Sequence, residues 1–412
     1  MDGNNKIKKV VIVGGGFAGI TAALQLTKKN TDNLDVILIS DKDWFDYKPG
    51  IFRVVGNFKP YKVRIPLEVI FRSKKVKLVK DTVENFSFSN QHVGTNNGTN
   101  YYYDFLILAL GSEVDYHGLP VLSDMTFSAN SVLEAIELNK HVEEVVSKMR
   151  AAEKDERLAL GHFVIVGGGA TGVEMAGAIS LYAKKIAKRQ GVDPSFIMVD
   201  LIESGSRVLK TMPEDFSDHV KRKLKDLDVN IIYNRRVTEE HLEEVYLKDT
   251  HIKTWSIIWA AGVRANRLVT DIHDVKTDNE GRIIVDQTLR IPGYANVFAI
   301  GDIIPDRFYG MAQTAIEHGR YVAEVITNLN LGEHVSAYEA KSVSYAVPVG
   351  PNWAAIMIGQ FKLYGWIGSL IKNGIDLKFL NSIISPRKNL EILLSSDDER
   401  NGGTHRIQIN GN

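Results

Sequence analysis

Short apolar runs alternate with helix-like segments along most of this chain. An apolar run at 10–13 leads into a glycine turn and a segment with helical periodicity, and a second apolar run ends at Ser40. The same order recurs between 163 and 203. Buried parallel strands read as continuous apolar runs, and strands that alternate with helices form βαβ units. The pattern therefore predicts an α/β fold with two Rossmann-like units.

Further apolar runs extend both units. Asn97-Gly98 predicts a hairpin turn between strands, and 131–157 has the period of a helix that leads into the second unit. The remaining buried strands are expected at 105–110, 228–234, 256–262 and 296–303.

Each unit carries G-x-G-x-x-G between its first strand and its helix. The glycines are Gly14, Gly16 and Gly19 in the first unit and Gly167, Gly169 and Gly172 in the second. The first glycine allows a tight turn, the second lets the backbone approach a pyrophosphate, and the third lets the helix pack on the strand. The helix N-terminus offers unpaired N–H groups to the phosphates. Two such motifs in this context predict two dinucleotide sites.

Polar residues at the strand ends are candidates for contacts with the ribose. Either Ser40 or Asp41 can face the adenosine ribose in the first unit, and the alternative for Asp41 is a turn-starting residue. In the second unit Glu203 can accept hydrogen bonds from a ribose 2′-OH and repel a 2′-phosphate, which favours NADH over NADPH. Arg207 lies close enough in sequence to weaken that preference, and Glu203 can also be an ordinary strand-end acid.

Two further carboxylates have both a structural and a functional interpretation. Glu174 lies in the first helical turn after Gly172, where the helix dipole alone would stabilise it. Beside a bound nicotinamide, partial burial would instead raise its pKa and let it handle protons. Asp302 follows the apolar run of 296–303, and it either caps a turn or binds a ligand hydroxyl.

Composition narrows the classes of function. The chain of 412 residues has 50 basic and 50 acidic residues, which argues against nucleic-acid binding. The basic segment 184–196 lacks interleaved aromatic residues and is interpreted as a solvated helix face. There is no cysteine, so disulfides, thiolate metal sites and thiol redox centres are excluded, and we expect no metal site. No signal peptide or spanning segment is evident, so we expect a cytoplasmic protein or one on the cytoplasmic face of a membrane.

The order of these motifs resembles flavoproteins of the pyridine nucleotide–disulfide reductase superfamily. The resemblance covers about residues 7–385 and includes YDFLILALGS, SIIWAAGV and NVFAIGD. It implies that the first glycine motif holds FAD, that the second holds NAD(P)H, and that Asp302 binds the flavin ribityl chain. The segments around 105–112 and 256–262 then resemble the strands that cross between the two domains.

Within that superfamily the chain most resembles type II NADH dehydrogenases and the coenzyme Q reductases similar to apoptosis-inducing factor. DKDWFDYKPGIFRVV resembles their flavin-flanking loop, with Pro49 at the matching proline, and MAQTAIEHG resembles the motif that lines the quinone site. Gln313 matches that motif, whereas Glu317 stands where a second glutamine is common. Ser40 also departs from the family, which usually has an acid there.

The resemblance implies domain limits and site residues. We expect an FAD-binding domain from 1–130 and 288–345, an NAD(P)H-binding domain from 131–287, and a C-terminal region from 346–412. The expected catalytic residues are Glu174, Gln313, Glu317 and Lys372. The expected cofactor-binding residues are Gly14, Gly15, Gly16, Phe17, Ala18, Gly19, Ser40, Asp41, Lys48, Pro49, Val83, Ala109, Gly111, Gly167, Gly169, Thr171, Gly172, Glu203, Gly262, Gly301, Asp302 and Ala312.

The C-terminal segment 361–384 resembles the start of the family's membrane-attachment region. Its exposed apolar side is expected to include Trp366, Ile367, Leu370, Ile371, Phe379, Leu380, Ile383 and Ile384. Lys362, Lys372 and Lys378 are candidate interfacial cations. The alternatives are a helix docked on the protein or buried in a homodimer. The polar tail that follows does not resemble a second anchoring helix.

Three functions from different classes follow. The first is transfer of a hydride from NADH to FAD and then of two electrons to a quinone. The second is reduction of a soluble acceptor such as a small redox protein, and the third is redox sensing by a flavoprotein. A sulfide:quinone oxidoreductase has a similar loop, but a chain without cysteine cannot carry sulfur.

Overall fold

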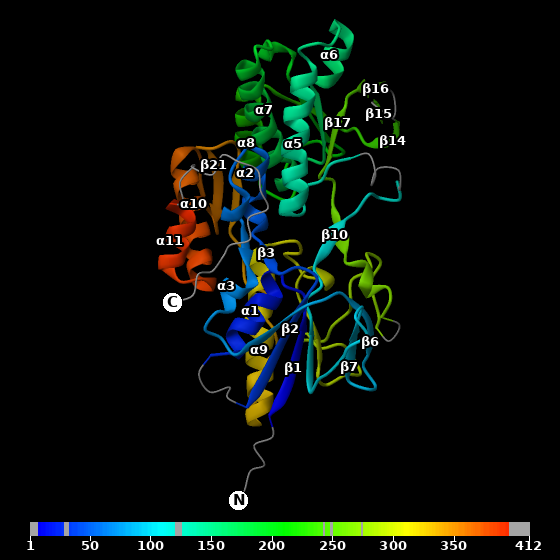
Figure 1. Cartoon of the computed structure of the whole chain (residues 1–412), viewed down its shortest axis with the longest axis vertical. Coiled ribbons are helices and arrows are strands. Elements are labelled where there is room, and N and C mark those ends of the chain that lie inside the picture. Colours follow the sequence, from blue (N-terminus) through cyan, green and yellow to red (C-terminus); the bar gives the residue numbers. More distant parts are fainter. Residues whose placement is uncertain are drawn as a thin grey trace, which may run out of the picture.

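The computed structural model describes residues 7–28, 33–119, 126–241, 244–247, 250–272 and 275–394. Its first unit is a five-stranded parallel sheet with strand order β19-β9-β1-β2-β5. The strands are β1 (Lys8–Val13), β2 (Leu34–Ser40), β5 (Val76–Lys80), β9 (Phe105–Leu108) and β19 (Val297–Ala299). Strand β19 comes from late in the chain, so the first unit is discontinuous in sequence (Figure 1).

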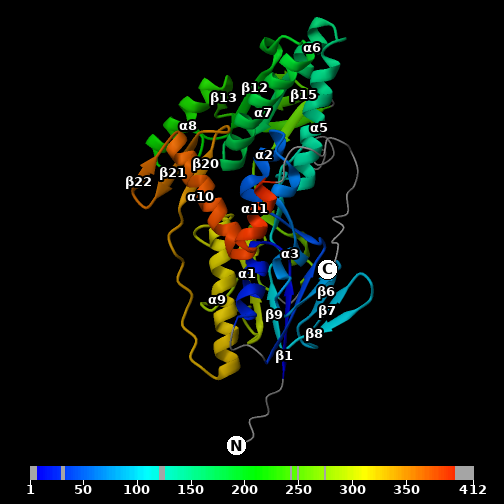
Figure 2. The same ribbon diagram turned by 60° about the vertical axis from the view of Figure 1, so that its left-hand side comes forward.

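Helices α1 (Phe17–Leu26) and α9 (Ala312–Leu331) run side by side against this sheet (Figure 2). Their close approach requires a glycine, because a Cβ at Gly319 would lie 2.4 Å from the carbonyl oxygen of Ala18. The flavin-flanking loop ends in the short helix α2 (Ile51–Val55), and the short helix α3 (Leu67–Phe71) follows it in sequence.

The second unit is a four-stranded parallel sheet with order β13-β12-β11-β17. Its strands are β11 (His162–Val166), β12 (Met198–Glu203), β13 (Val229–Tyr233) and β17 (Ser256–Trp259). Its helices are α5 (Val132–Lys148), α6 (Lys154–Leu160), α7 (Ala170–Gln190) and α8 (Glu214–Asp226). The single helix expected at 131–157 is therefore two helices, and the basic segment 184–196 forms the end of α7 and the turn after it.

A two-stranded ribbon links the units, made of β10 (Ser112–Val114) and β18 (Val263–Ala265). The smaller sheets are formed by β3 (Trp44–Asp46) with β4 (Arg64–Pro66), by β6 (Val83–Ser87), β7 (His92–Thr95) and β8 (Asn100–Tyr102), and by β14 (Val237–His241), β15 (Glu244–Leu247) and β16 (Thr250–Lys253). The hairpin predicted at Asn97-Gly98 connects β7 to β8, with Gly98 at a φ of 81°.

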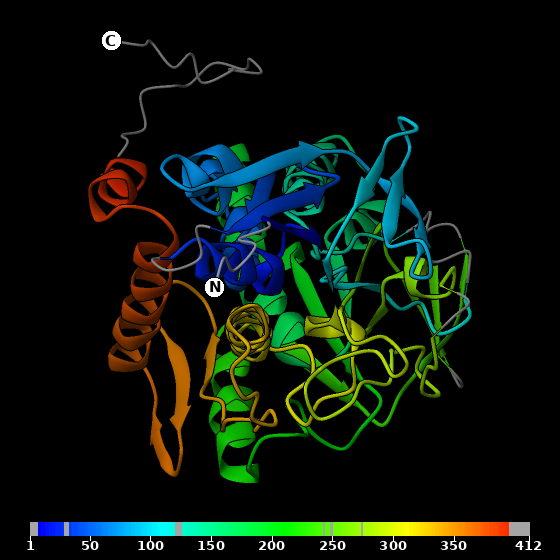
Figure 3. The ribbon, with the colours of Figure 1, turned by 90° about the horizontal axis from the view of Figure 1, so that it is seen from below.

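The C-terminal region lies along one flank and touches both units (Figure 3). It contains the antiparallel sheet β20 (Tyr345–Pro348), β21 (Ala354–Ile358) and β22 (Phe361–Leu363), then α10 (Trp366–Ile383) and α11 (Pro386–Leu394). The helix expected from 361 therefore begins later, because the first three residues complete a hairpin. A second helix, α11, follows α10 in the first part of the polar tail, and the tail beyond 394 lies outside the described residues.

Candidate functional site

One cavity of about 1690 Å³ runs between the two units and joins both glycine motifs. Pockets for a drug-sized ligand occupy up to about 1000 Å³, so this volume suits two large ligands. Of the predicted site residues, all line the cavity except Gly19 and Gly172. The structure therefore brings together residues from 14 to 372 that the sequence assigned to one site.

The two glycine motifs have the same geometry. A Cβ at Gly14 would lie 2.1 Å from the carbonyl oxygen of Ala109, and one at Gly167 would lie 2.4 Å from that of Ala260. A Cβ at Gly19 or Gly172 would lie 2.0 or 1.8 Å from the carbonyl oxygen of its own motif's first glycine. The third glycines thus pack helix against turn, as their position in the motif predicts, and this explains why they do not line the cavity.

Both motifs leave backbone donors for a ligand. Helices α1 and α7 begin at the N-caps Gly16 and Gly169, and neither N-cap has a side chain that bonds the first-turn N–H groups. A Cβ at either glycine would meet nothing within 4 Å, so a ligand can approach the backbone there. These open helix N-termini fit the pyrophosphates of FAD and NADH.

The strand-end positions of the two units correspond but carry different side chains. A Cβ at Gly15 would lie 2.8 Å from Ser40 Oγ, and a Cβ at Gly168 would lie 2.7 Å from Glu203 Oε2. Ser40 is buried, whereas Asp41 is exposed at the wall of the cavity. The first unit therefore has a hydroxyl where the second has a carboxylate, and Asp41 is the nearest acid in sequence to that hydroxyl.

Glu203 is held by the backbone of its own unit. Its Oε2 accepts a hydrogen bond from Gly168 N–H at 2.8 Å, and its Oε1 accepts one from Gly205 N–H at 2.5 Å. Oε1 also accepts a hydrogen bond from Ser204 Oγ at 3.3 Å. Because a carboxylate can accept about four hydrogen bonds, capacity for one from a ribose remains. The Arg207 guanidinium donates to the carbonyl oxygens of Met212 and Lys210, at 2.7 Å each, and is thus committed to the loop.

Asp302 lies in the short helical turn after β19. Its Oδ2 accepts a hydrogen bond from Ser112 Oγ at 2.8 Å, which leaves its other oxygen for a ligand hydroxyl. The preceding Gly301 N–H donates to His318 Nδ1 at 3.1 Å, and His318 Nε2 faces Asp306 Oδ2 at 3.3 Å. The sequence did not predict a role for Ser112, His318 or Asp306, because each acts through a partner distant in sequence or on another element.

The flavin-flanking loop contributes a cation. Lys48 lines the cavity, and its Nζ donates to Asn130 Oδ1 at 2.8 Å. Lys48 is solvent-exposed at the cavity wall. Desolvation by the surrounding protein lowers its pKa, and the nearby Asp302 carboxylate acts in the opposite direction. A cation with few polar partners suits a ligand that carries or develops negative charge.

The two acidic candidates for proton transfer differ in their electrostatic surroundings. Glu174 lines the cavity, and burial raises its pKa to about 8 while Lys372 opposes that rise. Glu317 instead forms ion pairs with Arg320, at 2.6 Å, and Lys341, at 2.9 Å. The pKa of Glu317 is lowered despite partial burial, because these cations stabilise the carboxylate. Glu174 is therefore suited to carry a proton near neutral pH, and Glu317 is held as an anion.

Gln313 has one end of its amide fixed. Its Oε1 accepts a hydrogen bond from Ser344 N–H at 3.1 Å. A backbone N–H must face an acceptor, so this contact sets the orientation of the amide. The side-chain NH₂ group keeps its capacity to donate, as a quinone carbonyl would require.

Lys372 was expected to be an interfacial cation as well as a catalytic residue, and its interfacial assignment is wrong. It is buried in the cavity wall, where its Nζ contacts Asp376 Oδ1 at 2.5 Å. Asp376 also accepts from Tyr47 and Arg53, which the sequence analysis missed. The spacing of four between Lys372 and Asp376 on a predicted helix was the available signal.

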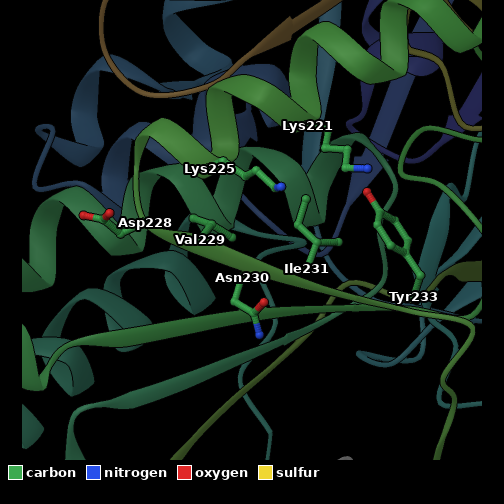
Figure 4. Close-up of a pocket in the computed structure, with 7 residues that line it drawn as sticks. All are labelled: Lys221, Lys225, Asp228, Val229, Asn230, Ile231 and Tyr233. Atoms are coloured by element: carbon green, nitrogen blue, oxygen red, sulfur yellow. The ribbon is translucent and has the colours of Figure 1, made fainter.

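A second, smaller pocket of about 480 Å³ lies between α8 and the edge strand β13 (Figure 4). It contains neither glycine motif and none of the predicted site residues. Its lining residues are Lys221, Lys225, Asp228, Val229, Asn230, Ile231 and Tyr233. The described part of the chain also brings no group of at least three His, Asp or Glu side chains together that could hold a metal ion.

Comparisons with known proteins agree with this geometry. The family of pyridine nucleotide-disulphide oxidoreductases matches residues 8–319. A type II NADH:quinone oxidoreductase from Staphylococcus haemolyticus is 27% identical over 387 residues, which cover 90% of this chain and 94% of the relative. The resemblance to type II NADH dehydrogenases and the expected α/β fold are thereby confirmed.

Two solved structures share the fold at low sequence identity. The structure of NDH2 from Plasmodium falciparum in complex with NADH is 16% identical, with a TM-score of 0.85 over 94% of this chain and 97% of that one. The sulfide:quinone oxidoreductase of Aquifex aeolicus is 18% identical, with a TM-score of 0.76 over 94% of this chain and 96% of that one.

Proposed function

The chain belongs to the pyridine nucleotide-disulphide oxidoreductase family, and we propose that it transfers a hydride from NADH to FAD and then two electrons to a quinone. The observation that carries this proposal is the single cavity that both glycine motifs share with Glu174, Gln313 and Lys372. When bound, FAD supplies the hydride-accepting and electron-donating chemistry. The protein contributes binding, orientation and control of protons.

The two glycine units bind the cofactors in this proposal. The open N-terminus of α1, Asp302 and Lys48 hold FAD, with Asp302 offering its free oxygen to a ribityl hydroxyl. The open N-terminus of α7 and Glu203 hold NADH. Because Arg207 is committed to loop carbonyls, it does not compete for a 2′-phosphate, and Glu203 favours NADH.

The acceptor side needs a hydrogen-bond donor and protons. A quinone that gains two electrons also takes up two protons, and negative charge develops on its carbonyl oxygens. Gln313 can donate through its NH₂ group, Lys372 can compensate the charge, and Glu174 can hold a proton near neutral pH. These roles favour a quinone over an acceptor that takes electrons without protons.

We also propose that α10 rests on the cytoplasmic face of a membrane. Among the residues that the structure describes, no helix has both the length and the apolar character to cross a bilayer. Helix α10 exposes Trp366 (69%) and Leu370 (63%), and the adjacent hairpin exposes Phe361 (81%). Its inner side meanwhile lines the cavity at Lys372. A helix with this polarity fits an interface in which lipid covers the apolar side.

Stopped-flow spectroscopy tests the catalytic proposal. NADH should bleach the flavin absorbance of the purified holoprotein, and a short-chain ubiquinone or menaquinone analogue should restore it rapidly. Fast reoxidation by a soluble redox protein but not by either quinone would support the alternative of a soluble acceptor. Slow reoxidation by every acceptor, with a stable reduced flavin–NAD⁺ complex, would support a redox sensor instead.

A further inference from the structure

The face of α10 that points into the protein carries a buried cluster of charged and polar side chains centred on Asp376. Lys372 and Asp376 expose 5% and 7% of their side chains, and Tyr47 is also buried. Three segments meet there: α10 supplies Lys372 and Asp376, the flavin-flanking loop supplies Tyr47, and α2 supplies Arg53. Buried charges are rare unless they are paired, so the cluster calls for an explanation.

Asp376 accepts a hydrogen bond from each of these three partners. Its Oδ1 accepts from Tyr47 Oη and from Lys372 Nζ, both at 2.5 Å. Its Oδ2 accepts from Arg53 at 3.0 Å. Lys372 Nζ also donates to the carbonyl oxygen of Pro49 at 3.3 Å. The carboxylate therefore ties α10 to the loop that flanks the expected flavin and fixes the position of the Lys372 ammonium group.

Glu174 of α7 completes the set of charged groups around Lys372. The charges of Lys372, Asp376 and Arg53 all act on Glu174, and Tyr47 also interacts with Glu174. Burial lowers the pKa of Lys372, while Asp376 and Glu174 oppose that change and Arg53 adds to it. Without Asp376, Lys372 would lie buried beside Arg53 without its hydrogen-bonded counterion.

We propose that Asp376 is a positioning residue for reduction of the acceptor, which keeps Lys372 charged and aimed into the cavity beside Glu174. The inference rests on the proposed quinone reductase function. Asp376 acts through Lys372: the ammonium ion compensates the negative charge that develops on the quinone, and Asp376 holds that ion in place. If Asp376 had only the structural role of holding α10 against the loop, it would stabilise the fold equally well but would not control the charge of Lys372.

The test compares flavin reoxidation by a short-chain ubiquinone at pH 6 and pH 8 in the wild type, Asp376→Asn, Lys372→Met and the double variant. At pH 8, Asp376→Asn should be at least about tenfold slower than the wild type, as expected for loss of a group that assists proton or charge transfer. Its rate should recover towards the wild type at pH 6, where Lys372 regains its proton. Lys372→Met should be slow at both values, and the double variant should be no slower than Lys372→Met.

The control variant is Asn373→Ala. Asn373 accepts a hydrogen bond from the same Arg53 at 2.9 Å but carries no charge, so its loss should leave the pH profile unchanged. If the Asp376→Asn variant does not retain flavin, the double variant Asp376→Asn/Arg53→Gln takes its place in the same comparison. This double variant removes one negative and one positive charge. Flavin reduction by NADH should be near wild type in every variant.

Two results would overturn the inference. In one, the Asp376 variant is equally slow at pH 6 and pH 8, as a purely structural role requires. In the other, Asp376→Asn slows reoxidation as much in the Lys372→Met background as it does in the wild type. If the wild type itself is not reoxidised by quinone, the proposed function fails instead, and the two failures are thus distinguishable.

Discussion

At the scale of single residues, the two cofactor sites differ most where they correspond most closely. Ser40 and Glu203 both end the second strand of their unit, and each faces the glycine between the first two motif glycines, Gly15 or Gly168. Only Glu203 places a charge there. A carboxylate can bind a ribose 2′-OH and repels a 2′-phosphate, so this one side chain is expected to set the choice between NADH and NADPH.

Glu203→Ala should lower kcat/KM for NADH about tenfold to a hundredfold, since a hydrogen bond to a charged group contributes about 1.5–3 kcal/mol. The kcat/KM for NADPH should fall less, so the preference for NADH over NADPH should become smaller. Loss of the contacts to Gly168 and Gly205 would disturb both cofactors alike, and the ratio therefore isolates the ribose contact. Steady-state kinetics with both cofactors make the measurement. Equal efficiency with NADH and NADPH in the wild type would contradict this role.

At the scale of elements, α9 contributes to both the proposed cofactor site and the proposed acceptor site. Its buried His318 accepts a hydrogen bond from the Gly301 N–H, which orients the turn that carries Asp302. Gln313 and Glu317 line the cavity from the same helix. The four-residue spacing predicted their shared side, but it could not predict that Arg320 and Lys341 neutralise Glu317.

Gln313→Leu should slow flavin reoxidation by quinone about a hundredfold, because a donor aimed at developing negative charge typically contributes at least that much. Glu317→Ala should slow it less, since that carboxylate is already committed to two cations. Flavin reduction by NADH should stay near wild type in both. Glu324→Ala on the exposed side of α9 is the control. Stopped-flow traces of each half-reaction provide the comparison, and equal loss in both half-reactions would place Gln313 outside the acceptor site.

Local sequence patterns predicted much of this site, but they could not predict the contacts between residues that are distant in sequence. The glycine motifs and strand ends could be placed because their geometry is set within a few residues. The contact between Tyr47 and Asp376 joins residues 329 apart, and nothing in either segment alone announces it. Helical periodicity likewise cannot tell which side of a helix the protein covers. Leu380, Ile383 and Ile384 therefore seemed suited to a membrane surface but are buried, while Ile375 and Leu377 are exposed.

At the scale of the whole molecule, the C-terminal region connects the two units. The hairpin docks on α8 through Lys362, whose Nζ lies 2.5 Å from Asp215 Oδ1, and through the rings of His219 and Tyr364, which stack at 3.9 Å. Helix α10 docks on the first unit through the Asp376 cluster and the stack of Phe379 on Tyr47. Lys362 is therefore engaged within the protein, whereas Lys378 is exposed and stays a candidate interfacial cation.

This arrangement makes the proposed membrane contact separable from catalysis, because Trp366 and Leu370 are exposed on α10 and do not line the cavity. Trp366→Ser/Leu370→Ser should abolish most cosedimentation with vesicles of phosphatidylglycerol and phosphatidylcholine, since each apolar side chain transferred from water contributes about 1.5–3 kcal/mol. Flavin reduction by NADH and reoxidation by a water-soluble quinone should be unchanged. Leu331→Ser is the matched control, because Leu331 is similarly exposed (53%) but ends α9, far from the C-terminal flank (Figure 2). Unchanged vesicle binding together with a shift from dimer to monomer would show instead that a second copy of the chain covers this surface.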